Sequence, residues 1–291
     1  MLERPDWAVI VHGGARTIPP GRQQHHRQGC LEAVTAAASV LAAGRGAVDA
    51  VEAAIRVLEA DPTFNAGRGS VPNAAGNVEC DAAIMDGRDL TVGAVAAVRI
   101  LRHPISVARR MLPERPVLLV ADGAEAFARD HGGELCEPDY LRMPDTETAG
   151  CDTVGCVAID IRGSIAAGTS TGGLSGCMAG RVGDSPLPGC GLYADDAVGG
   201  VSLSGEGESL IRTTLASRLM QALEQNDPQT AVAGALERLE RVGGEAGLIV
   251  IDRRGRFGWD HTSDHFAVAR ASASEPARAF IHRSEDEGSH V

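Results

Sequence analysis

The residues that could do chemistry begin with a threonine that directly follows an acidic residue. Asp152 precedes Thr153, and the apolar run at residues 154–161 predicts that Thr153 begins a strand. If the chain is cut between these two residues, Thr153 carries a hydroxyl nucleophile and a free α-amine that can serve as its general base. The alternative is an ordinary strand residue, because threonine is favoured in strands. By itself the pair favours that structural alternative, and the nucleophile needs further support.

Three segments after Thr153 carry groups that could serve such a nucleophile. Residues 169–173 (Thr-Ser-Thr-Gly-Gly) bring hydroxyls beside a glycine pair, and residues 204–208 (Ser-Gly-Glu-Gly-Glu) lead into a predicted helix. Between them, Arg181 and Asp184 stand three residues apart in a glycine-rich turn. Arginine can hold a carboxylate through two hydrogen bonds and aspartate can hold an ammonium, so the two together suit an α-amino acid. The alternative is a surface ion pair, the commoner role of such residues.

The elements that must position these groups come in blocks of strands and blocks of helices. Residues 8–11 predict a short strand that ends in a glycine turn, and residues 154–161 and 164–169 predict a β-hairpin. Residues 209–223 predict one amphipathic helix. Because strands and helices do not alternate strictly, the pattern favours a layered α+β fold over a parallel sheet. The other predicted elements are helices at residues 23–43, 47–59, 105–111, 124–129 and 228–239, and strands at residues 79–85, 90–98, 117–121, 247–252, 265–271 and 280–282.

Residues 132–152 differ in composition from the segments on either side. They contain several acidic residues and prolines with little periodic hydrophobicity, which predicts an exposed, mobile connector. A chain can be cut in such a connector without unfolding. Because the strand with Thr153 starts immediately afterwards, the connector favours the nucleophile interpretation. We expect a single domain over residues 1–291.

The composition excludes several classes of partner. The formal net charge is -12, whereas nucleic acids and anionic membranes attract proteins with a surplus of Lys and Arg. We therefore expect a small-molecule or dipeptide substrate. The chain shows neither a signal-peptide pattern nor a membrane-span pattern, which predicts a cytoplasmic protein. The 7 cysteines include no C-x-x-C pair, so neither a disulfide framework nor a zinc site is expected.

Five motifs occur along nearly the whole chain in a specific order. They are Val-His-Gly-Gly-Ala at residues 11–15, Phe-Asn-Ala-Gly at 64–67, Asp-Ala-Ala-Ile-Met-Asp-Gly at 81–87, Asp-Thr-Val-Gly at 152–155 and Gly-Arg-Val-Gly-Asp-Ser-Pro at 180–186. With these motifs the chain resembles the plant-type asparaginase and isoaspartyl peptidase family, within the N-terminal nucleophile hydrolases. Each motif alone is a modest signal, and the five in this order are a strong one.

The resemblance implies a fold, a maturation step and a reaction. The fold would be a four-layer αββα sandwich, and the precursor would cut itself between Asp152 and Thr153. The α chain of residues 1–152 and the β chain of residues 153–291 would stay together, and two such αβ units would form a dimer. The reaction would be hydrolysis of isoaspartyl peptides and of the side-chain amide of L-asparagine, through a β-aspartyl ester on Thr153.

The resemblance also implies a role for each residue of the site. Thr153 would be the nucleophile and its freed amine the base, while Thr171 would orient or polarise the hydroxyl. Arg181 would bind the α-carboxylate of the substrate, and Asp184 would bind its α-ammonium. The other roles are an oxyanion hole of the Ser204 hydroxyl and the Gly205 N–H, help to the ammonium from the Gly207 carbonyl, and a hydrogen bond from Asn65 near the nucleophile. For Asn65 the alternative is to bind its own backbone, as Asn in glycine turns usually does.

No cofactor is expected for catalysis, but the resemblance implies a structural sodium ion. Its ligands would be backbone carbonyls of the loop at residues 58–68, and a hard cation bound by oxygen atoms is physically reasonable there. These carbonyls would be those of Leu58, Glu59, Asp61, Phe64, Ala66 and Arg68.

Some positions depart from the isoaspartyl peptidase pattern and keep related enzymes as alternatives. Isoaspartyl peptidases commonly have glycine at the position of Asp152, whereas glycosylasparaginases and threonine aspartases have aspartate there, as this chain does. Ser204 stands where asparaginases usually have threonine. Tyr-Ala-Asp-Asp at residues 193–196 also occurs in glycosylasparaginases, although the motifs near the N-terminus resemble the asparaginases. Asp184 argues against a threonine-aspartase-like protease, since those proteins lack this carboxylate. A non-enzymatic homologue is disfavoured because the set of site residues is intact.

Overall fold

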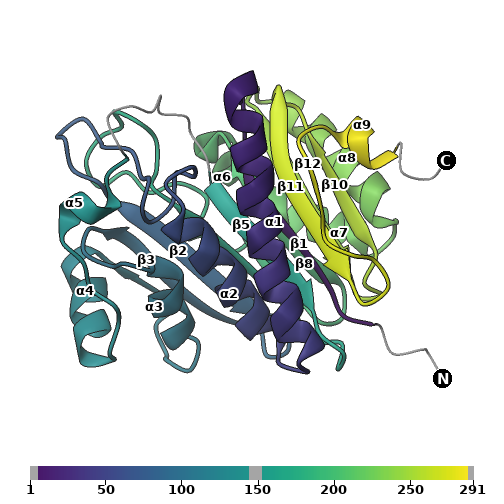
Figure 1. The fold of residues 1–291 in the computed structure, drawn as a ribbon, viewed down its shortest axis with the longest axis horizontal. Helices are drawn as coiled ribbons and strands as arrows, with labels where there is room; N and C mark the ends of the chain where they lie inside the picture. Colours follow the sequence, from purple (N-terminus) through teal and green to yellow (C-terminus); the bar gives the residue numbers. More distant parts are fainter. Residues whose placement is uncertain (1–5, 144–152, 288–291) are drawn as a thin grey trace.

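The computed structural model describes residues 6–143 and 153–287 and has an α+β fold with two β-sheets (Figure 1). All neighbouring strands of the two sheets are antiparallel except β3 and β4. The larger sheet has the order β12 (Arg278–Phe280), β11 (His265–Ser272), β1 (Ala8–Arg16), β5 (Thr153–Ile159), β6 (Ile165–Thr171), β2 (Cys80–Asp86), β3 (Thr91–Val98) and β4 (Leu118–Val120). The smaller sheet has the order β10 (Phe257–His261), β9 (Ala246–Asp252), β8 (Gly199–Gly205) and β7 (Leu192–Asp195).

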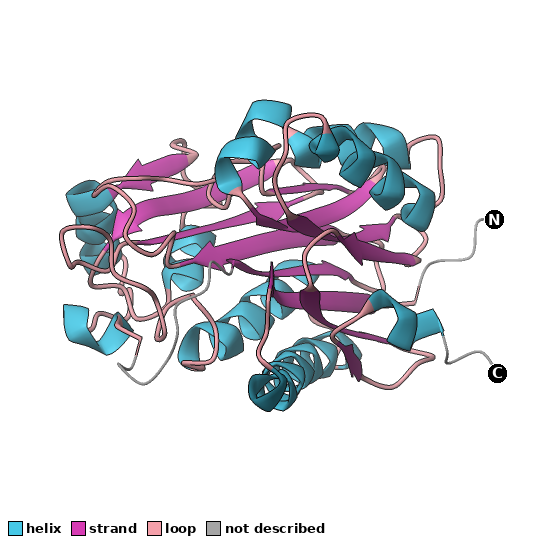
Figure 2. Cartoon of the chain, turned by 90° about the horizontal axis from the view of Figure 1, so that it is seen from above, coloured by secondary structure: helices cyan, strands magenta, loops and turns pink. Residues whose placement is uncertain are grey.

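The helices lie against the sheets, as Figure 2 shows from above. The first four contact the larger sheet, and the long C-terminal pair α7 and α8 contacts the smaller one. The helices of the described residues are α1 (Pro20–Ala42), α2 (Ala47–Ala60), α3 (Pro104–Arg110), α4 (Ala121–Asp130), α5 (Pro138–Leu141), α6 (Gly207–Thr213), α7 (Leu215–Leu223), α8 (Pro228–Glu240) and α9 (Arg283–Glu287). None of the helices in these ranges combines the length and apolar character needed to cross a lipid bilayer.

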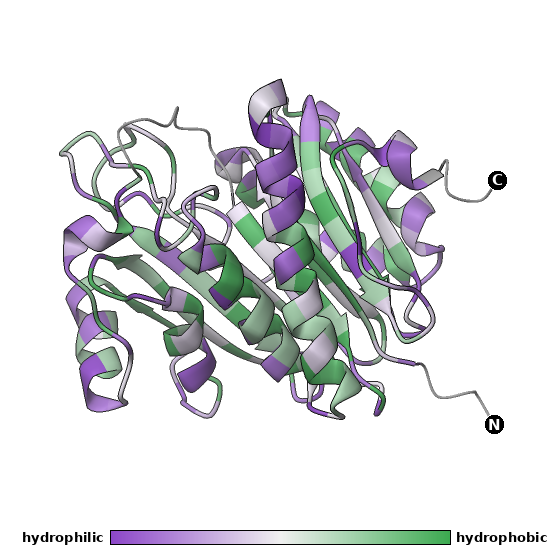
Figure 3. Ribbon diagram, viewed as in Figure 1, coloured by the Kyte–Doolittle hydropathy of each residue, from purple (hydrophilic) through white to green (hydrophobic). Residues whose placement is uncertain are grey.

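Alternating side chains give the larger sheet a different apolar core on each face. In β1, Val9 and Val11 pack in the core shared with α1 and α2, whereas Ala8 and Ile10 pack in the core shared with the smaller sheet. A third core joins α7 and α8 to β8 and β9. In Figure 3 the first turns of α1 are hydrophilic and its later turns are mostly hydrophobic. The strands are thus held by apolar packing, while the candidate residues Thr153 and Thr171 lie at strand ends.

One row of residues crosses three neighbouring strands at such an end. Thr153 at the start of β5 pairs with Thr171 at the end of β6, and Thr171 pairs with Asp81 in β2 on its other side. The predicted β-hairpin is confirmed as β5 and β6, which join through a turn after Asp160. The antiparallel register therefore brings a candidate nucleophile, a second threonine and a carboxyl to one edge of the sheet.

The prediction of one helix at residues 209–223 is wrong. The backbone of Thr214 is left-handed, with φ 48°, and it separates α6 from α7. Such a φ is costly for a β-branched residue, so packing of α7 on the smaller sheet overrides the local preference for a continuous helix. The sequence analysis also missed β7 and β8, which pair with each other and, through β8, with β9.

The first half of the predicted connector is attached to the domain rather than free. Residues 138–141 form α5, and the Leu141 side chain is fully buried. The carbonyl of Leu141 accepts hydrogen bonds from the N–H groups of Gly69 and Ser70, and Met143 N–H donates to the Ser70 carbonyl. Residues 144–152, which include Asp152 and the predicted cut, lie outside the described residues.

Candidate active site

Thr153 presents both of its potentially reactive atoms to neighbouring side chains. Its side chain is almost buried, with 8% of the residue exposed. Its backbone N–H donates to Ser204 Oγ at 3.4 Å, and its Oγ1 lies 3.1 Å from Ser185 Oγ. The nitrogen and the oxygen are therefore held by different partners, an arrangement that suits a residue in which both atoms act.

Thr171 lies beside Thr153 and is supported by the turn that follows β6. Thr171 Oγ1 accepts a hydrogen bond from Gly173 N–H at 3.1 Å, and Asn65 Nδ2 donates to the Gly173 carbonyl at 2.7 Å. Asn65 Oδ1 accepts from Val71 N–H at 3.0 Å. Both polar ends of the Asn65 side chain thus bind backbone groups, and Asn65 supports Thr171 through Gly173 instead of contacting the nucleophile.

Ser204 and Gly205 end β8 close to the start of β5. Ser204 Oγ accepts hydrogen bonds from Ala15 N–H at 3.1 Å and from Thr153 N–H at 3.4 Å. Because a hydroxyl has two acceptor lone pairs and one proton, its proton remains available to an oxyanion. A side chain at Gly205 would collide with the Glu245 carbonyl, so the close approach of these two chain segments requires glycine.

Arg181 is held in place by a carboxylate from the start of α6. Its Nε and Nη2 each donate to Glu208 at 2.9 Å, which makes the ion pair bidentate. The Arg181 side chain is 13% exposed and that of Glu208 is 52% exposed. Gly207 fits under the guanidinium, because a Cβ there would lie 2.7 Å from Arg181 Nη2 and 3.0 Å from Asp184 Oδ1. The pair and the glycine together orient Arg181 toward the Asp184 carboxyl.

Asp184 is a buried carboxyl with spare acceptor capacity. The residue is 3% exposed, and its Oδ2 has no hydrogen-bond partner among the described residues. Burial raises the pKa of Asp184 to about 7, with the nearby Asp81 adding to the rise and the Arg181 charge opposing it. A cation such as an ammonium would stabilise the charged form and satisfy the unpaired oxygen. Asp184 therefore has the properties of a binding group for a positive charge.

One small cavity collects the candidate residues. It brings together Thr153, Thr171, Arg181, Asp184 and Gly205, whereas Asn65, Ser204 and Gly207 are not among the residues that line it. Its full lining is Thr153, Thr171, Gly173, Leu174, Arg181, Gly183, Asp184, Ser185 and Gly205. The lining thus brings a guanidinium, a carboxyl and the hydroxyl of a candidate nucleophile to one space.

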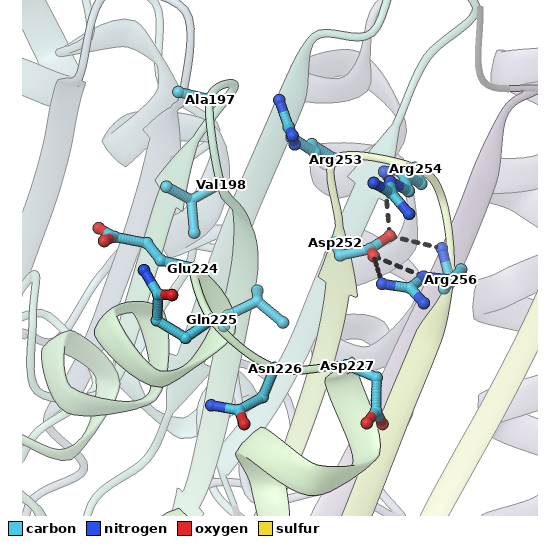
Figure 4. A pocket seen from close by; sticks show the side chains of 11 residues that line it. Ala197, Val198, Glu224, Gln225, Asn226, Asp227, Asp252, Arg253, Arg254 and Arg256 are labelled. Carbon is cyan, nitrogen blue, oxygen red and sulfur yellow. Dashed lines mark hydrogen bonds and ion pairs between the residues drawn. The ribbon is translucent and has the colours of Figure 1, made fainter. Parts of the chain in front are cut away.

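A more open pocket lies elsewhere, between the end of α7 and the turn that joins β9 to β10 (Figure 4). Arg253, Arg254 and Arg256 point from this turn, and Arg256 pairs with Asp252 at 2.7 Å. The pocket shares no lining residue with the cavity around Thr153. Within the described residues, no group of His, Cys, Asp and Glu side chains forms a metal site.

Comparison with known proteins identifies the family. A family model described as asparaginase matches residues 5–148 and 142–281 of the chain. The chain belongs to this asparaginase family. It is 43% identical to an isoaspartyl peptidase/L-asparaginase of Danio rerio, over 86% of this chain and 87% of that protein. It is 41% identical to an isoaspartyl peptidase/L-asparaginase of Homo sapiens, over 90% of this chain and 92% of that protein.

More distant relatives extend the same similarity. A probable isoaspartyl peptidase/L-asparaginase of Drosophila melanogaster is 36% identical, over 91% of this chain and 92% of that protein. Because the alignments span both described ranges, they include the segments that carry all five motifs. The asparaginase family membership therefore applies to the whole site and not to one part of the chain.

Two residues of this asparaginase site were missed by the sequence analysis. Ser185 contacts the hydroxyl of Thr153, and Asp81 accepts a hydrogen bond from Ala97 N–H at 2.8 Å. Burial raises the pKa of Asp81 to about 7, while hydrogen bonds from the N–H groups of Ala97 and Gly183 oppose the rise. Two features of the sequence could have indicated these residues. Asp81 is the one carboxyl residue in the otherwise apolar segment 81–85, and Ser185 directly follows Asp184.

Proposed function

We propose that this chain is a self-processing amidohydrolase that cleaves isoaspartyl peptides and the side-chain amide of L-asparagine. The observation that carries the proposal is the convergence of Thr153, Arg181 and Asp184 on one cavity. A substrate with an α-carboxylate and an α-ammonium can bind there with its side-chain carbonyl toward the threonine. The names of the fish and human relatives, isoaspartyl peptidase/L-asparaginase, support the same substrates.

In the proposed complex, the two charged groups of the substrate meet two charged side chains. Glu208 uses Nε and one N–H of Nη2 of Arg181, and a guanidinium has five N–H donors, so others remain for the α-carboxylate. The unpaired Oδ2 of Asp184 accepts from the α-ammonium. The carbonyl of Gly207 supplies a further acceptor for the ammonium.

The proposed reaction proceeds through an ester. Thr153 Oγ1 attacks the side-chain carbonyl carbon, and its proton passes to the freed α-amine of the same residue. The Ser204 hydroxyl and the Gly205 N–H stabilise the oxyanion, and each such donor contributes about 10²–10³-fold in rate. The α-amine returns the proton to the leaving ammonia or peptide amine. Water then hydrolyses the β-aspartyl ester and restores the hydroxyl.

Maturation would use the same oxygen. We propose that Thr153 Oγ1 attacks the carbonyl carbon of Asp152 and that the Asp152–Thr153 peptide bond breaks as an ester forms, while the hydroxyl proton passes to the nitrogen that becomes the α-amine. Water then hydrolyses this ester and separates residues 1–152 from residues 153–291. The two sheets with helices on their outer faces would then be a four-layer αββα sandwich of the N-terminal nucleophile hydrolase type, and two αβ units would form a dimer. The cytoplasmic location and the lack of nucleic-acid and membrane partners stay predictions from the sequence.

The end of α2 and the loop after it supply oxygen atoms suited to the sodium ion that we propose. The Glu59 carbonyl accepts from Arg68 N–H at 2.7 Å, and the Asp61 carbonyl accepts from Phe64 N–H at 3.2 Å. Each carbonyl has a second lone pair, so these bonds leave acceptor capacity for a hard cation. The proposed ligands are the carbonyls of Leu58, Glu59, Asp61, Phe64, Ala66 and Arg68.

We predict that sodium raises the thermal stability of the protein. An ion that binds only the folded state raises the free energy of unfolding by about 2.7 kcal/mol when its concentration is 100 times its Kd. Melting temperatures measured in sodium chloride should therefore exceed those in choline chloride at equal ionic strength, in a saturable way. Identical melting curves in the two salts at all concentrations would contradict a sodium site.

The structure weakens the argument for a glycosylasparaginase. The motif at residues 193–196 has a structural role, because Asp196 Oδ1 accepts from Ile165 N–H at 2.7 Å and Asp196 N–H donates to the Gly87 carbonyl at 3.0 Å. These bonds join the end of β7 to β6 and to the turn after β2. A protease of the threonine aspartase type is disfavoured because the buried Asp184 suits a free ammonium.

The proposed function is tested by a side-by-side assay of β-aspartyl-leucine, L-asparagine and glycosylated asparagine. We expect hydrolysis of the first two with release of aspartate, and kcat/KM for glycosylated asparagine at least about 10²-fold lower, an achievable ratio for one poorly fitting group. Preferred cleavage of glycosylated asparagine would overturn the proposal in favour of the alternative enzyme. Absence of hydrolysis of all three by fully processed protein would overturn both.

A further inference from the structure

The hydroxyl of the nucleophile has a serine neighbour to which neither the motifs nor the comparisons give a role. We propose that Ser185 is a catalytic residue that holds Thr153 Oγ1 in its reactive position and donates a hydrogen bond to it as its proton leaves. This inference rests on the proposed function, since it assigns a group to the same nucleophile. It starts from the 3.1 Å distance between the two hydroxyl oxygens.

The contact between the hydroxyls is shielded from water. Ser185 is 1% exposed and Thr153 is 8% exposed. A hydrogen bond in such a site is stronger than the same bond at a surface, because no water competes for the donor or the acceptor. Both residues also line the cavity that holds the substrate in the proposed complex. Ser185 therefore lies at the reacting atom and not behind it.

Ser185 is fixed by bonds that do not use its own hydroxyl. Its carbonyl accepts from Thr169 Oγ1 at 2.6 Å, which ties it to β6 two residues before Thr171. Its neighbours Asp184 and Pro186 restrict it further, since Leu187 N–H donates to the Asp184 carbonyl at 2.9 Å and proline has a fixed φ. The anchored backbone leaves the hydroxyl available to follow Thr153 Oγ1 during the reaction.

The other hydroxyls around Thr153 have different partners. Ser204 Oγ contacts the Thr153 nitrogen and the Ala15 N–H, so it serves the amine side and the oxyanion. Thr171 Oγ1 accepts from Gly173 N–H. Ser185 is the hydroxyl for which the structure gives a contact with Oγ1 itself. Ser185 and Ser204 therefore contact different atoms of Thr153, the hydroxyl oxygen and the nitrogen.

The proton count fixes the direction of the bond during catalysis. A hydroxyl has one donor and two acceptor positions, so Thr153 can direct its proton to the α-amine while Oγ1 accepts from Ser185. When that proton passes to the α-amine, Oγ1 still accepts the hydrogen bond from Ser185. Ser185 keeps its own proton throughout and forms no covalent bond. Its effect is on the charge that develops at Oγ1, where hydrogen bonds are strongest.

The experiment compares Ser185→Ala with the wild type and with Ser106→Ala. Ser106 is a buried serine of α3 whose hydroxyl donates to Glu52 Oε1 at 2.7 Å, so its loss also removes the hydrogen bond of a buried side chain. For each protein we would measure the rate of self-cleavage on denaturing gels, kcat and KM for β-aspartyl-leucine per processed chain, and the melting temperature. A third variant, Ser185→Thr, retains the hydroxyl.

We expect Ser185→Ala to lower kcat by about 10- to 100-fold, the effect of one hydrogen bond to a charged oxygen, and to leave KM within about twofold. Self-cleavage should slow by a similar factor. Ser106→Ala should lower the melting temperature without changing kcat. Ser185→Thr should recover most of the lost kcat.

Two results would overturn the role of Ser185. One is a kcat of Ser185→Ala equal to that of the wild type. The other is a loss confined to KM, because that would mean that the change only displaces the neighbouring Asp184. A wild type that cleaves itself but hydrolyses no aspartyl substrate would refute the proposed substrates alone, and the self-cleavage rates of the variants would still decide about Ser185. A wild type that does neither would overturn both.

Discussion

Replacing Thr153 by alanine is expected to abolish self-cleavage and to lower hydrolysis by about 10⁴- to 10⁶-fold, as loss of the nucleophile does in other covalent hydrolases. The change removes the oxygen that lies 3.1 Å from Ser185 Oγ and leaves the backbone nitrogen and the charged side chains in place. The measurement combines a denaturing gel with mass spectrometry of the fragments. The wild type should give fragments that end at Asp152 and begin at Thr153, and the variant should stay whole.

A matched control separates chemistry from folding in this experiment. Thr35→Ala removes a threonine hydroxyl from the exposed face of α1, where it only donates to the Leu31 carbonyl, and should leave both activities unchanged. Hydrolysis that survives in Thr153→Ala would contradict the mechanism and direct attention to the cysteines. Cys156 is a poor substitute, because it is fully buried and burial raises the pKa of its thiol far above the usual range.

The second large effect is expected for Asp184→Asn. We expect kcat/KM to fall by about 10²–10³-fold, or about 3–4 kcal/mol, because a buried carboxylate that pairs with the substrate ammonium is lost while the shape of the side chain is kept. The loss should appear mainly as a higher KM, since Thr153 is not touched. Asp122→Asn is a suitable control, because this side chain is 92% exposed on α4. An unchanged KM would refute the ammonium site.

The same carboxyl gives the wild type a specific pH dependence. Burial raises the pKa of Asp184 to about 7, so in the empty site the Asp184 carboxyl is mostly neutral below this pH and mostly charged above it. The wild-type KM should therefore fall as the pH rises from about 6 to about 8, and Asp184→Asn should lose this trend. Stability should also fall as the pH rises, because the folded state binds this proton more tightly than the unfolded state does. The contribution of Asp184 to stability is present at low pH and lost as the pH rises through about 7.

The parts of the fold that could be predicted from the sequence are those with a local cause. The hairpin of β5 and β6 follows from two apolar runs around a turn at Arg162 and Gly163. The strands β7 and β8 lack such a signal, because glycines at 199 and 200 interrupt the apolar pattern, and they exist by pairing with each other and with β9. The break between α6 and α7 occurs at Thr214, and neither glycine nor proline stands there to predict it from the sequence.

The candidate site divides in the same way. Thr153, Arg181 and Asp184 stand in short motifs, so their chemistry could be inferred before their positions were known. The contacts of Ser185 with Thr153 and of Glu208 with Arg181 could not be inferred, because the two residues of each contact are 32 and 27 positions apart in the chain. Partners at such distances are set by sheet register and loop packing, which no local pattern contains. The role of Asp81 depends on the same pairing of β2 with β6.

The row of Asp81, Thr171 and Thr153 across three strands links the chemistry to the quality of folding. A slip of one residue in β6 would turn Thr171 to the opposite face of the sheet and separate it from both neighbours. If the chain cuts itself as proposed, only molecules with correctly aligned strands would do so. Self-cleavage would then report whether the strands are correctly aligned. The fraction of uncut chain on a denaturing gel would measure the amount of misassembled protein, and this measurement needs no substrate.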